Sequence, residues 1–245
     1  MGLEKLKNSA RKRVRKLYNF FIDLKPRPPL IPATLKEFNE IQELGRRRSA
    51  TNEHIVTLFL ESLLLQPKLI VELGVARGGS TYIFERVAAL SGATLVSVDI
   101  NDCSRASAYQ DWHFIHKDDI EFAREFPAWC RERNIEPNID ILFIDTSHYY
   151  EHTVQEIEHY FPLLSEKAKV FFHDTNINNF FFRRDGSIDL GWDNERGVIR
   201  AIEDFFHRRF NEKIAFTTII NGWLIKHDPY CCGFTILEKI PSLGG

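Results

Sequence analysis

The sequence predicts a doubly wound α/β fold, with a mostly parallel sheet of seven strands that ends in an antiparallel hairpin. Short β-type runs alternate with longer helical patterns from Leu69 to Leu237, which indicates βαβ units. A glycine-rich turn, Gly74 to Ser80, follows the first run. The last two runs lie too close together for a helical crossover, which predicts the hairpin.

The bulk composition indicates one main domain with a small-molecule partner. The chain has 245 residues, of which 44% are hydrophobic, enough for a substantial core. Its 32 basic and 34 acidic residues give a formal net charge of -2. Nucleic-acid binding usually needs a strong positive field, so no nucleic-acid partner is expected.

The cysteines and the hydropathy pattern predict a cytoplasmic protein. No CxxC pair is present, so we expect reduced thiols at Cys103, Cys130, Cys231 and Cys232. No apolar run approaches the roughly 20 residues that span a bilayer. The basic N-terminal stretch also lacks the uninterrupted apolar run of a signal peptide.

Residues 1–30 predict a basic amphipathic helix and a proline-rich linker, attached to a main domain over residues 31–245. Apolar residues recur every three or four positions from Leu3 to Phe21, with Lys and Arg between them. The helix must end before Pro26, where Pro26 to Pro29 predict a stiff, extended linker. The favoured interpretation packs the apolar stripe on the domain or on a second copy in a homo-oligomer. The alternative is peripheral contact with an anionic membrane.

The remaining elements follow in order. Thr34 and Glu37 predict a capping box for a helix that Gly45 ends, and a second helix is expected from about Asn52 to Gln66. The sheet is expected from five runs, at Leu69–Leu73, Thr94–Asp99, His113–His116, Ile139–Asp145 and Val170–His173. Helices are expected between them at about Ser80–Leu90, Asp119–Arg133 and Glu151–Leu164. A helix over Gly197–Phe210 then precedes the paired runs Ile214–Ile220 and Gly233–Leu237.

The loop Gly74 to Ser80 is the predicted ligand-binding turn. In open α/β sheets, ligands bind beyond the carboxyl ends of the strands, where the strand order reverses. Glu72 stands two residues before Gly74, where a NAD-binding turn usually has an apolar residue, and Asp99 ends the second strand, where an acid can hold a ribose diol. Glu72 and the terminal hairpin both disfavour a NAD-dependent dehydrogenase.

The acid-x-Gly opening and the strand-end Asp99 resemble the first two motifs of class I S-adenosylmethionine-dependent methyltransferases, which have a Rossmann-like fold. The resemblance implies that S-adenosyl-L-methionine is the cofactor. Ala76 departs from the pattern, because many members of the class carry Gly there, and we expect a wider loop before Gly78. The implied cofactor-binding residues are Glu72, Gly74, Val75, Ala76, Gly78, Gly79, Ser80, Asp99, and Asp118 with its neighbour Asp119.

A second set of candidate residues follows the next two strands. Asp145 ends one strand, and His173 with Asp174 ends the next. Neighbouring parallel strands bring these ends into one cleft. The two carboxylates and the imidazole could bind one divalent cation, and imidazole suits Mn²⁺ or Fe²⁺ as well as Mg²⁺.

The pattern Ile144-Asp145-x-Ser147-His148-x-Tyr150-Glu151, followed by His173-Asp174, is similar to the macrocin and mycinamicin O-methyltransferases and the cephalosporin-hydroxylase-like group. In metal-dependent relatives the strand-four Asp and an acidic or Asp-Asn pair after strand five bind the metal, and His173-Asp174 departs from that pair. His148 stands where catechol O-methyltransferases place a lysine base. The resemblance therefore implies His148 and Asp145 as catalytic residues.

The predicted function is methyl transfer from S-adenosylmethionine to a hydroxyl of a small natural product, such as a sugar, polyketide or phenol, assisted by Mg²⁺ or Mn²⁺. The polar and aromatic stretch from Asn176 to Asn194, which includes Trp192, is a candidate lid. One alternative is a metal-independent N- or O-methyltransferase that uses His148 as its base. Another is a non-catalytic binding protein with this fold.

Overall fold

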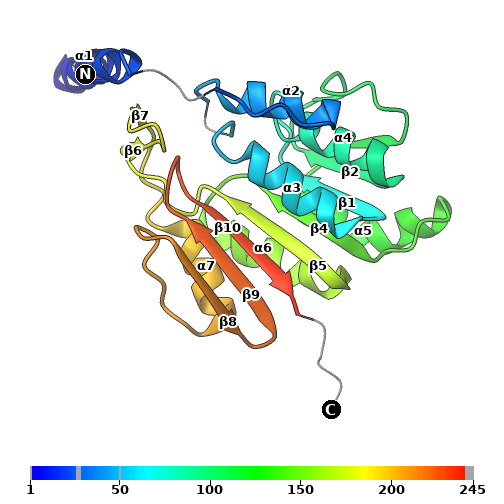
Figure 1. Cartoon of the computed structure of the whole chain (residues 1–245). Helices are drawn as coiled ribbons and strands as arrows, with labels where there is room; N and C mark the ends of the chain where they lie inside the picture. Colours follow the sequence, from blue (N-terminus) through cyan, green and yellow to red (C-terminus); the bar gives the residue numbers. More distant parts are fainter. Residues whose placement is uncertain (1, 26–28, 50, 241–245) are drawn as a thin grey trace.

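The computed structural model describes residues 2–25, 29–49 and 51–240. Its centre is one eight-stranded sheet, which confirms the predicted mostly parallel α/β fold with one strand more than expected. The strands are β1 (Leu69–Leu73), β2 (Thr94–Asp99), β3 (Trp112–His116), β4 (Ile139–Ile144), β5 (Leu164–His173), β8 (Phe216–Ile220), β9 (Trp223–Asp228) and β10 (Phe234–Lys239). Their order across the sheet is β3-β2-β1-β4-β5-β10-β9-β8 (Figure 1).

The parallel half of the sheet positions the functional loops. Strands β1 to β5 pair in parallel, and the order reverses between β1 and β4, which lie side by side with Leu73 paired to Ile144. All five residues of β1 are buried, as expected for a strand that is covered on both faces. The loops that follow β1, β2, β4 and β5 therefore meet at one end of the sheet.

The antiparallel edge differs from the prediction in its pairing. Ile214 to Ile220 was expected to pair directly with Gly233 to Leu237, but β9 lies between them. Strands β8 and β9 form a tight hairpin at Asn221 and Gly222, whose φ angles are 50° and 78°. Positive φ at both positions is the geometry of a type I′ turn, which Asn-Gly favours. Strand β10 pairs antiparallel with both β5 and β9, so the terminal hairpin is β9–β10.

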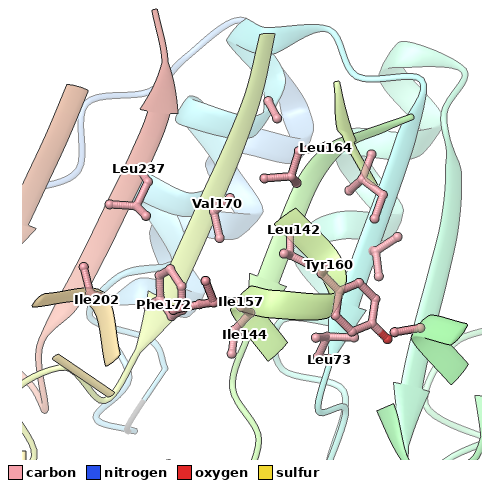
Figure 2. Packing of buried hydrophobic residues seen from close by; sticks show 14 of the residues in the cluster. Leu73, Leu142, Ile144, Ile157, Tyr160, Leu164, Val170, Phe172, Ile202 and Leu237 are labelled. Atoms are coloured by element: carbon pink, nitrogen blue, oxygen red, sulfur yellow. The ribbon is translucent and has the colours of Figure 1, made fainter. Parts of the chain in front are cut away.

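Helices cover both faces of the sheet and enclose two apolar cores. One face packs against α2 (Lys36–Gly45), α3 (Ile55–Leu65) and α4 (Thr81–Ser91). The other packs against α5 (Asp119–Glu132), α6 (Tyr150–Tyr160) and α7 (Gly197–Phe206). Figure 2 shows the second core, where Leu73, Leu142 and Phe172 of the sheet lie near Ile157 and Tyr160 of α6.

Helix α2 begins without the predicted capping box. Its N-cap residue is Leu35, with no side-chain hydrogen bond to the helix, so Thr34 and Glu37 do not cap it. The preceding turn is held instead by Asn39, whose side chain accepts from the backbone N–H of Ala33 and donates to its carbonyl, both at 2.8 Å. The start of α2 is therefore stabilised by a side chain from within the helix, and not by a residue that precedes it.

The predicted N-terminal helix is present as α1 (Gly2–Asp23), and it lies against a two-stranded hairpin, β6 (Phe180–Phe182) and β7 (Ile188–Leu190) (Figure 1). The Asn19 side chain donates to the carbonyl of Ile188 at 2.8 Å and accepts from its N–H at 2.9 Å. Arg15 pairs with Asp189 at 2.5 Å. The helix thus docks through polar groups, and the expectation that its apolar stripe packs on the domain was wrong, because Leu17 and Phe21 are exposed.

The predicted linker lies mostly outside the described residues, since Pro26 and Pro28 belong to the undescribed segment. Among the helices that the structure describes, none is both long enough and apolar enough to cross a membrane.

Candidate active site

A pocket of about 360 Å³ lies at the carboxyl ends of β1, β2 and β4. Each of these strand ends contributes one residue that was predicted from the sequence: Gly74, Asp99 and Asp145. The complete lining is Gly74, Ala76, Val98, Asp99, Ile100, Asn101, Lys117, Asp118, Asp119, Asp145, Thr146, Ser147 and His152. The predicted ligand-binding turn and the loop after β4 therefore face one space.

Gly74 allows the turn after β1 to contact the turn after β4. Its φ is +88°, and a Cβ at this position would lie 2.1 Å from the carbonyl oxygen of Asp145. Any side chain would have to displace backbone, so glycine is required here. The contact brings the candidate cofactor loop against Asp145.

Ala76 adopts the conformation that a glycine would take. Its φ is +47°, in the left-handed region that L-residues other than Gly, Asn and Asp rarely occupy. Its N–H donates to Oδ2 of Asp99 at 3.0 Å, and this bond holds the strained residue in place. The loop is therefore as tight as a glycine loop, and the expected wider path was wrong.

Asp99 organises the turn with both carboxylate oxygens. Oδ2 accepts the N–H groups of Val75 and Ala76, and Oδ1 accepts the backbone and side-chain N–H groups of Asn101. Partial burial raises the pKa of Asp99, but these hydrogen bonds outweigh burial and hold it below its usual value. Asp99 therefore stays ionised at the rim of the pocket.

Glu72 lies in the core and not in the pocket. It is fully buried and accepts hydrogen bonds from Thr81 Oγ1 at 2.9 Å and Ser97 Oγ at 2.6 Å. Burial raises its pKa to about 7. Glu72 thus joins β1 to β2 and to the start of α4. Four other predicted cofactor residues, Val75, Gly78, Gly79 and Ser80, also do not line the pocket.

Asp118 and Asp119 both line the pocket, at the start of α5. Asp118 caps the helix by accepting the N–H groups of Ile120 and Glu121. The Asp119 carboxylate contacts His152 at 3.0 Å. That hydrogen bond raises the pKa of His152 to about 9.

Asp145, His148 and Asp174 form the second cluster of the site. His148 Nε2 lies 2.9 Å from Oδ1 of Asp145 and 3.5 Å from Oδ2 of Asp174. Both His148 and Asp174 have positive φ, at 61° and 57°. Such strain costs about 1–3 kcal/mol per residue and is often found at functional sites. The loops after β4 and β5 thus hold two carboxylates and an imidazole together.

His173, predicted as a metal ligand, lies behind the two carboxylates. It is 2% exposed, and its Nδ1 lies 2.9 Å from Asp174 and 3.4 Å from Asp145. Burial lowers its pKa, but the two carboxylates outweigh burial and raise it well above its usual value. Its charge in turn helps to hold the pKa of Asp145 low, against the effect of burial. His173 therefore keeps Asp145 ionised from the buried side.

The donor set of Asp145, His148 and Asp174 fits a divalent cation. One ligand atom from each lies within 4.8 Å of the others, and the Asp174 side chain is buried. Two carboxylates with one imidazole suit Mn²⁺ or Fe²⁺ at least as well as Mg²⁺. The trio differs from the predicted one in containing His148 in place of His173.

Residues 71–175 match the model of a methyltransferase domain family. This part of the chain is therefore similar to a methyltransferase domain. The match runs from within β1 to two residues beyond β5, and so contains both the pocket lining and the carboxylate cluster. A search of curated proteins finds no match to the chain.

Solved structures with the same fold are also methyltransferases. One from Geobacter sulfurreducens is 18% identical, with a TM-score of 0.50, and the match covers 86% of this chain and 92% of that one. An O-methyltransferase from Bacillus cereus in complex with SAH is 15% identical, with a TM-score of 0.50 and coverage of 91% and 97%.

The MycE methyltransferase of mycinamycin biosynthesis, in complex with Mg, SAH and mycinamycin VI, is 16% identical, with a TM-score of 0.52. The match covers 86% of this chain and 57% of that one. At such identities the likeness establishes the fold. It confirms the predicted Rossmann-like fold, and the match over residues 71–175 agrees with the predicted S-adenosylmethionine-dependent methyltransferase.

The candidate lid ends beside His148. The Trp192 ring lies 6.1 Å from that of His148 and 5.6 Å from that of Tyr149. The Asn194 side chain donates to the carbonyls of His148 and Asp174, each at 3.4 Å. The end of the stretch from Asn176 to Asn194 therefore borders the carboxylate cluster with an aromatic face.

Seven residues of the pocket lining were not among the predicted site residues: Val98, Ile100, Asn101, Lys117, Thr146, Ser147 and His152. His152 and Glu156 are four residues apart, which places them on one face of α6. Glu156 is fully buried, and Thr146 Oγ1 donates to its Oε1 at 2.6 Å. The helical spacing could have indicated this pair, but only the fold shows that its partner is Asp119 on α5.

Proposed function

We propose that this chain is an O-methyltransferase that moves the methyl group of S-adenosylmethionine to a hydroxyl of a small molecule. The observation that carries the proposal is the position of Asp145. It lines the candidate cofactor pocket and also lies 2.9 Å from His148. One carboxylate thus borders the space for the methyl donor and orients the candidate base.

The charge of the pocket favours this donor over a dinucleotide. Its lining includes four carboxylates, Asp99, Asp118, Asp119 and Asp145. The only lysine in the lining, Lys117, pairs with Glu125 at 2.8 Å. A sulfonium cation is attracted by such a lining, whereas the pyrophosphate of NAD is repelled by it. Asp99 at the end of β2 can also accept from ribose hydroxyls, in addition to the turn it holds.

His148 is the group that would take the acceptor proton. Its imidazole is oriented by Asp145, and its backbone by Asn194, whose side chain donates to the His148 carbonyl. Burial lowers the pKa of His148, but the two neighbouring carboxylates outweigh it and raise the pKa. A base held in this way accepts a proton readily once it is neutral.

In this arrangement Asp145 and Asp174 would hold a divalent cation without His148, because the same imidazole nitrogen cannot bind the cation and accept the proton. The cation would supply Lewis acidity that lowers the pKa of an acceptor hydroxyl. His173 would keep Asp145 ionised from behind, since its Nδ1 lies 3.4 Å from that carboxylate. The fixed positions of these three side chains orient the acceptor oxygen toward the donor methyl.

The acceptor class that fits best is a hydroxylated ring of a natural product. Trp192 and Tyr149 offer partly exposed aromatic faces beside His148, and flat rings of this kind stack on sugars and phenols. MycE, whose structure holds mycinamycin VI, supports the same class by analogy of fold.

The donor can be tested by calorimetry with S-adenosylhomocysteine and with NAD. Micromolar binding of S-adenosylhomocysteine and at least about tenfold weaker binding of NAD are expected. A higher affinity for NAD than for S-adenosylhomocysteine would contradict the proposal. Transfer can be tested with methyl-labelled donor and a panel of hydroxylated sugars, macrolides and phenols, with matched amines. Label on amines alone would exclude the O-methyltransferase.

Cation dependence needs a separate experiment, because a metal-independent enzyme that uses His148 alone is the second candidate. Transfer measured after chelation, and again after Mg²⁺ or Mn²⁺ is restored, separates the two. Activity that survives complete chelation favours His148 alone. A chain that binds the donor but transfers no methyl group to any acceptor would support the non-catalytic alternative.

A further inference from the structure

Helix α1 presents its apolar stripe away from the rest of the protein. Three residues on one face, Arg15, Asn19 and Ile22, are partly buried at the β6–β7 hairpin. At 3.6 residues per turn, the apolar side chains lie on the nearly opposite face. Val14, Leu17 and Phe21 follow at helical spacing, and Leu24 continues the spacing one residue beyond the end of α1. Their exposures are 59–66%.

This arrangement is the reverse of an amphipathic helix that belongs to a core. Such a helix normally buries its apolar face and leaves its polar face in water. Here the polar face is fixed by the Arg15–Asp189 ion pair and the two Asn19 hydrogen bonds, so the helix cannot turn over without breaking them. The apolar stripe therefore remains available to a partner.

The charge of the segment points to the chemistry of that partner. Residues 1–25 carry eight Lys or Arg and two acidic residues, a formal +6, although the whole chain is -2. In the described part of α1, Arg11, Arg13 and Lys16 are exposed at the two borders of the stripe. Pairing this helix with α1 of a second copy would bring two such sets of positive charge together, which is unfavourable.

We propose that α1 docks the protein to an anionic lipid surface, with Val14, Leu17, Phe21 and Leu24 in the interface and the basic side chains on the headgroups. An in-plane helix of this kind binds through buried apolar area and through attraction to anionic lipid. The surface is independent of the proposed function, because none of these residues lines the pocket or the carboxylate cluster.

Docking would place the active site beside the lipid surface. Helix α1 contacts the β6–β7 hairpin, where Arg11 lies 5.6 Å from the ring of Phe180, and Phe180 and Phe182 are themselves exposed. The same stretch continues to Trp192 beside His148. One segment thus connects the lipid-facing helix to the acceptor side of the site.

The test is co-sedimentation of the full-length protein with vesicles of phosphatidylcholine alone or with roughly one third phosphatidylglycerol. Wild type is expected to bind the anionic vesicles at least about tenfold more strongly than the neutral ones. Leu17→Glu with Phe21→Glu should reduce that binding at least about tenfold, and Leu17→Ala with Phe21→Ala, which favours the helix, should reduce it in the same direction.

The matched control is Ile219→Glu, an exposed apolar residue on β8 at 65%, which should bind like wild type. Arg13→Glu with Lys16→Glu should remove the preference for phosphatidylglycerol. Sedimentation velocity is run on each variant. The proposal would be overturned if wild type did not bind anionic vesicles, or if the Leu17 and Phe21 variants bound them as strongly as wild type. A wild-type dimer that dissociates only in those variants would also overturn it.

Discussion

Nε2 of His148 lies 2.9 Å from Oδ1 of Asp145, although the two residues are only three positions apart and belong to a loop. The loop achieves this by placing His148 at a φ of +61°. Gly197 leaves room for the His148 backbone, because a Cβ at residue 197 would lie 2.5 Å from the carbonyl oxygen of His148. The pair is therefore built by the backbone of two segments.

Replacing His148 by Ala should lower turnover by roughly 10²- to 10⁴-fold while the affinity for S-adenosylhomocysteine stays near that of wild type. The reason is that His148 borders the pocket through Asp145 but does not line it. Single-turnover assays and calorimetry measure the two quantities. His159→Ala, on the exposed end of α6, is the matched control.

The comparison with Asp145→Ala separates the base from the cation. If the cation activates the acceptor, Asp145→Ala should cost more than His148→Ala, and raised Mn²⁺ should partly restore its turnover. Equal losses without rescue would favour His148 alone. Unchanged turnover in His148→Ala would assign that residue a role in the loop and leave the cation as the activating group.

Replacing Asp99 by Ala should weaken donor binding by about 1.5–3 kcal/mol, which is roughly ten- to a hundredfold. The substitution removes the acceptor for the N–H groups of Val75 and Ala76, so the turn loses its support, and it removes a ribose acceptor as well. Calorimetry with S-adenosylhomocysteine checks this. Asp102→Ala, an exposed acid three residues later, should bind normally. A folded Asp99→Ala protein with wild-type affinity would contradict the role given to this carboxylate.

Glu72 should make the protein less stable as pH rises. The pKa of Glu72 is about 7 in the folded state and 4.5 in the unfolded chain, so the folded state holds the proton more tightly. Stability is therefore fully present below pH 4.5 and declines up to about pH 7, by on the order of 1.4 kcal/mol per pH unit.

Urea unfolding at pH 5 and pH 8 measures this difference, and Glu72→Gln should reduce it. Glu151→Gln, on the exposed surface of α6, serves as the control. A Glu72→Gln protein that keeps the full wild-type pH dependence would place the titration elsewhere, for instance at Glu156, whose pKa is also raised by burial.

Ala76→Gly should leave the protein as stable as wild type or stabilise it by up to about 1 kcal/mol. Glycine removes the cost of the left-handed conformation, and the larger entropy of its unfolded chain offsets part of the gain. The opposite sign is expected for Ala89→Gly on the exposed face of α4, which should cost about 1 kcal/mol. Thermal unfolding of both variants gives the comparison, and a clear loss in Ala76→Gly would refute the assignment of strain.

The periodic elements of this fold could be predicted from the sequence, because buried strands and amphipathic helices repeat at fixed spacings. Strand β9 was missed although Asn221-Gly222 is a strong hairpin signal and Trp223, Ile225 and His227 alternate inward. The helix α1 was correctly predicted, but its orientation was not. Periodicity reveals that a helix has an apolar face, whereas the direction of that face depends on partners such as Asp189 and Ile188, which are distant in sequence.

The candidate site could likewise be predicted only in part. Strand ends place Asp99 and Asp145 at one pocket and Asp145 and Asp174 in one cluster, as the sequence predicted. The pattern could not show where a side chain points, and so Glu72 was assigned to the pocket although its oxygens face Thr81 and Ser97 in the core. It also could not rank His148 against His173, because the choice depends on which imidazole the loops leave accessible.

The contact between Gly74 and the carbonyl of Asp145 has a consequence for folding. The two halves of the pocket come from segments 71 residues apart in the sequence, and they meet only when β1 and β4 have paired. A partly folded chain therefore has no donor site, so the donor binds the native state alone. By mass action, donor at a hundred times its dissociation constant would stabilise the whole domain by about 2.7 kcal/mol. The donor concentration thus also shifts the equilibrium between the folded and the unfolded domain.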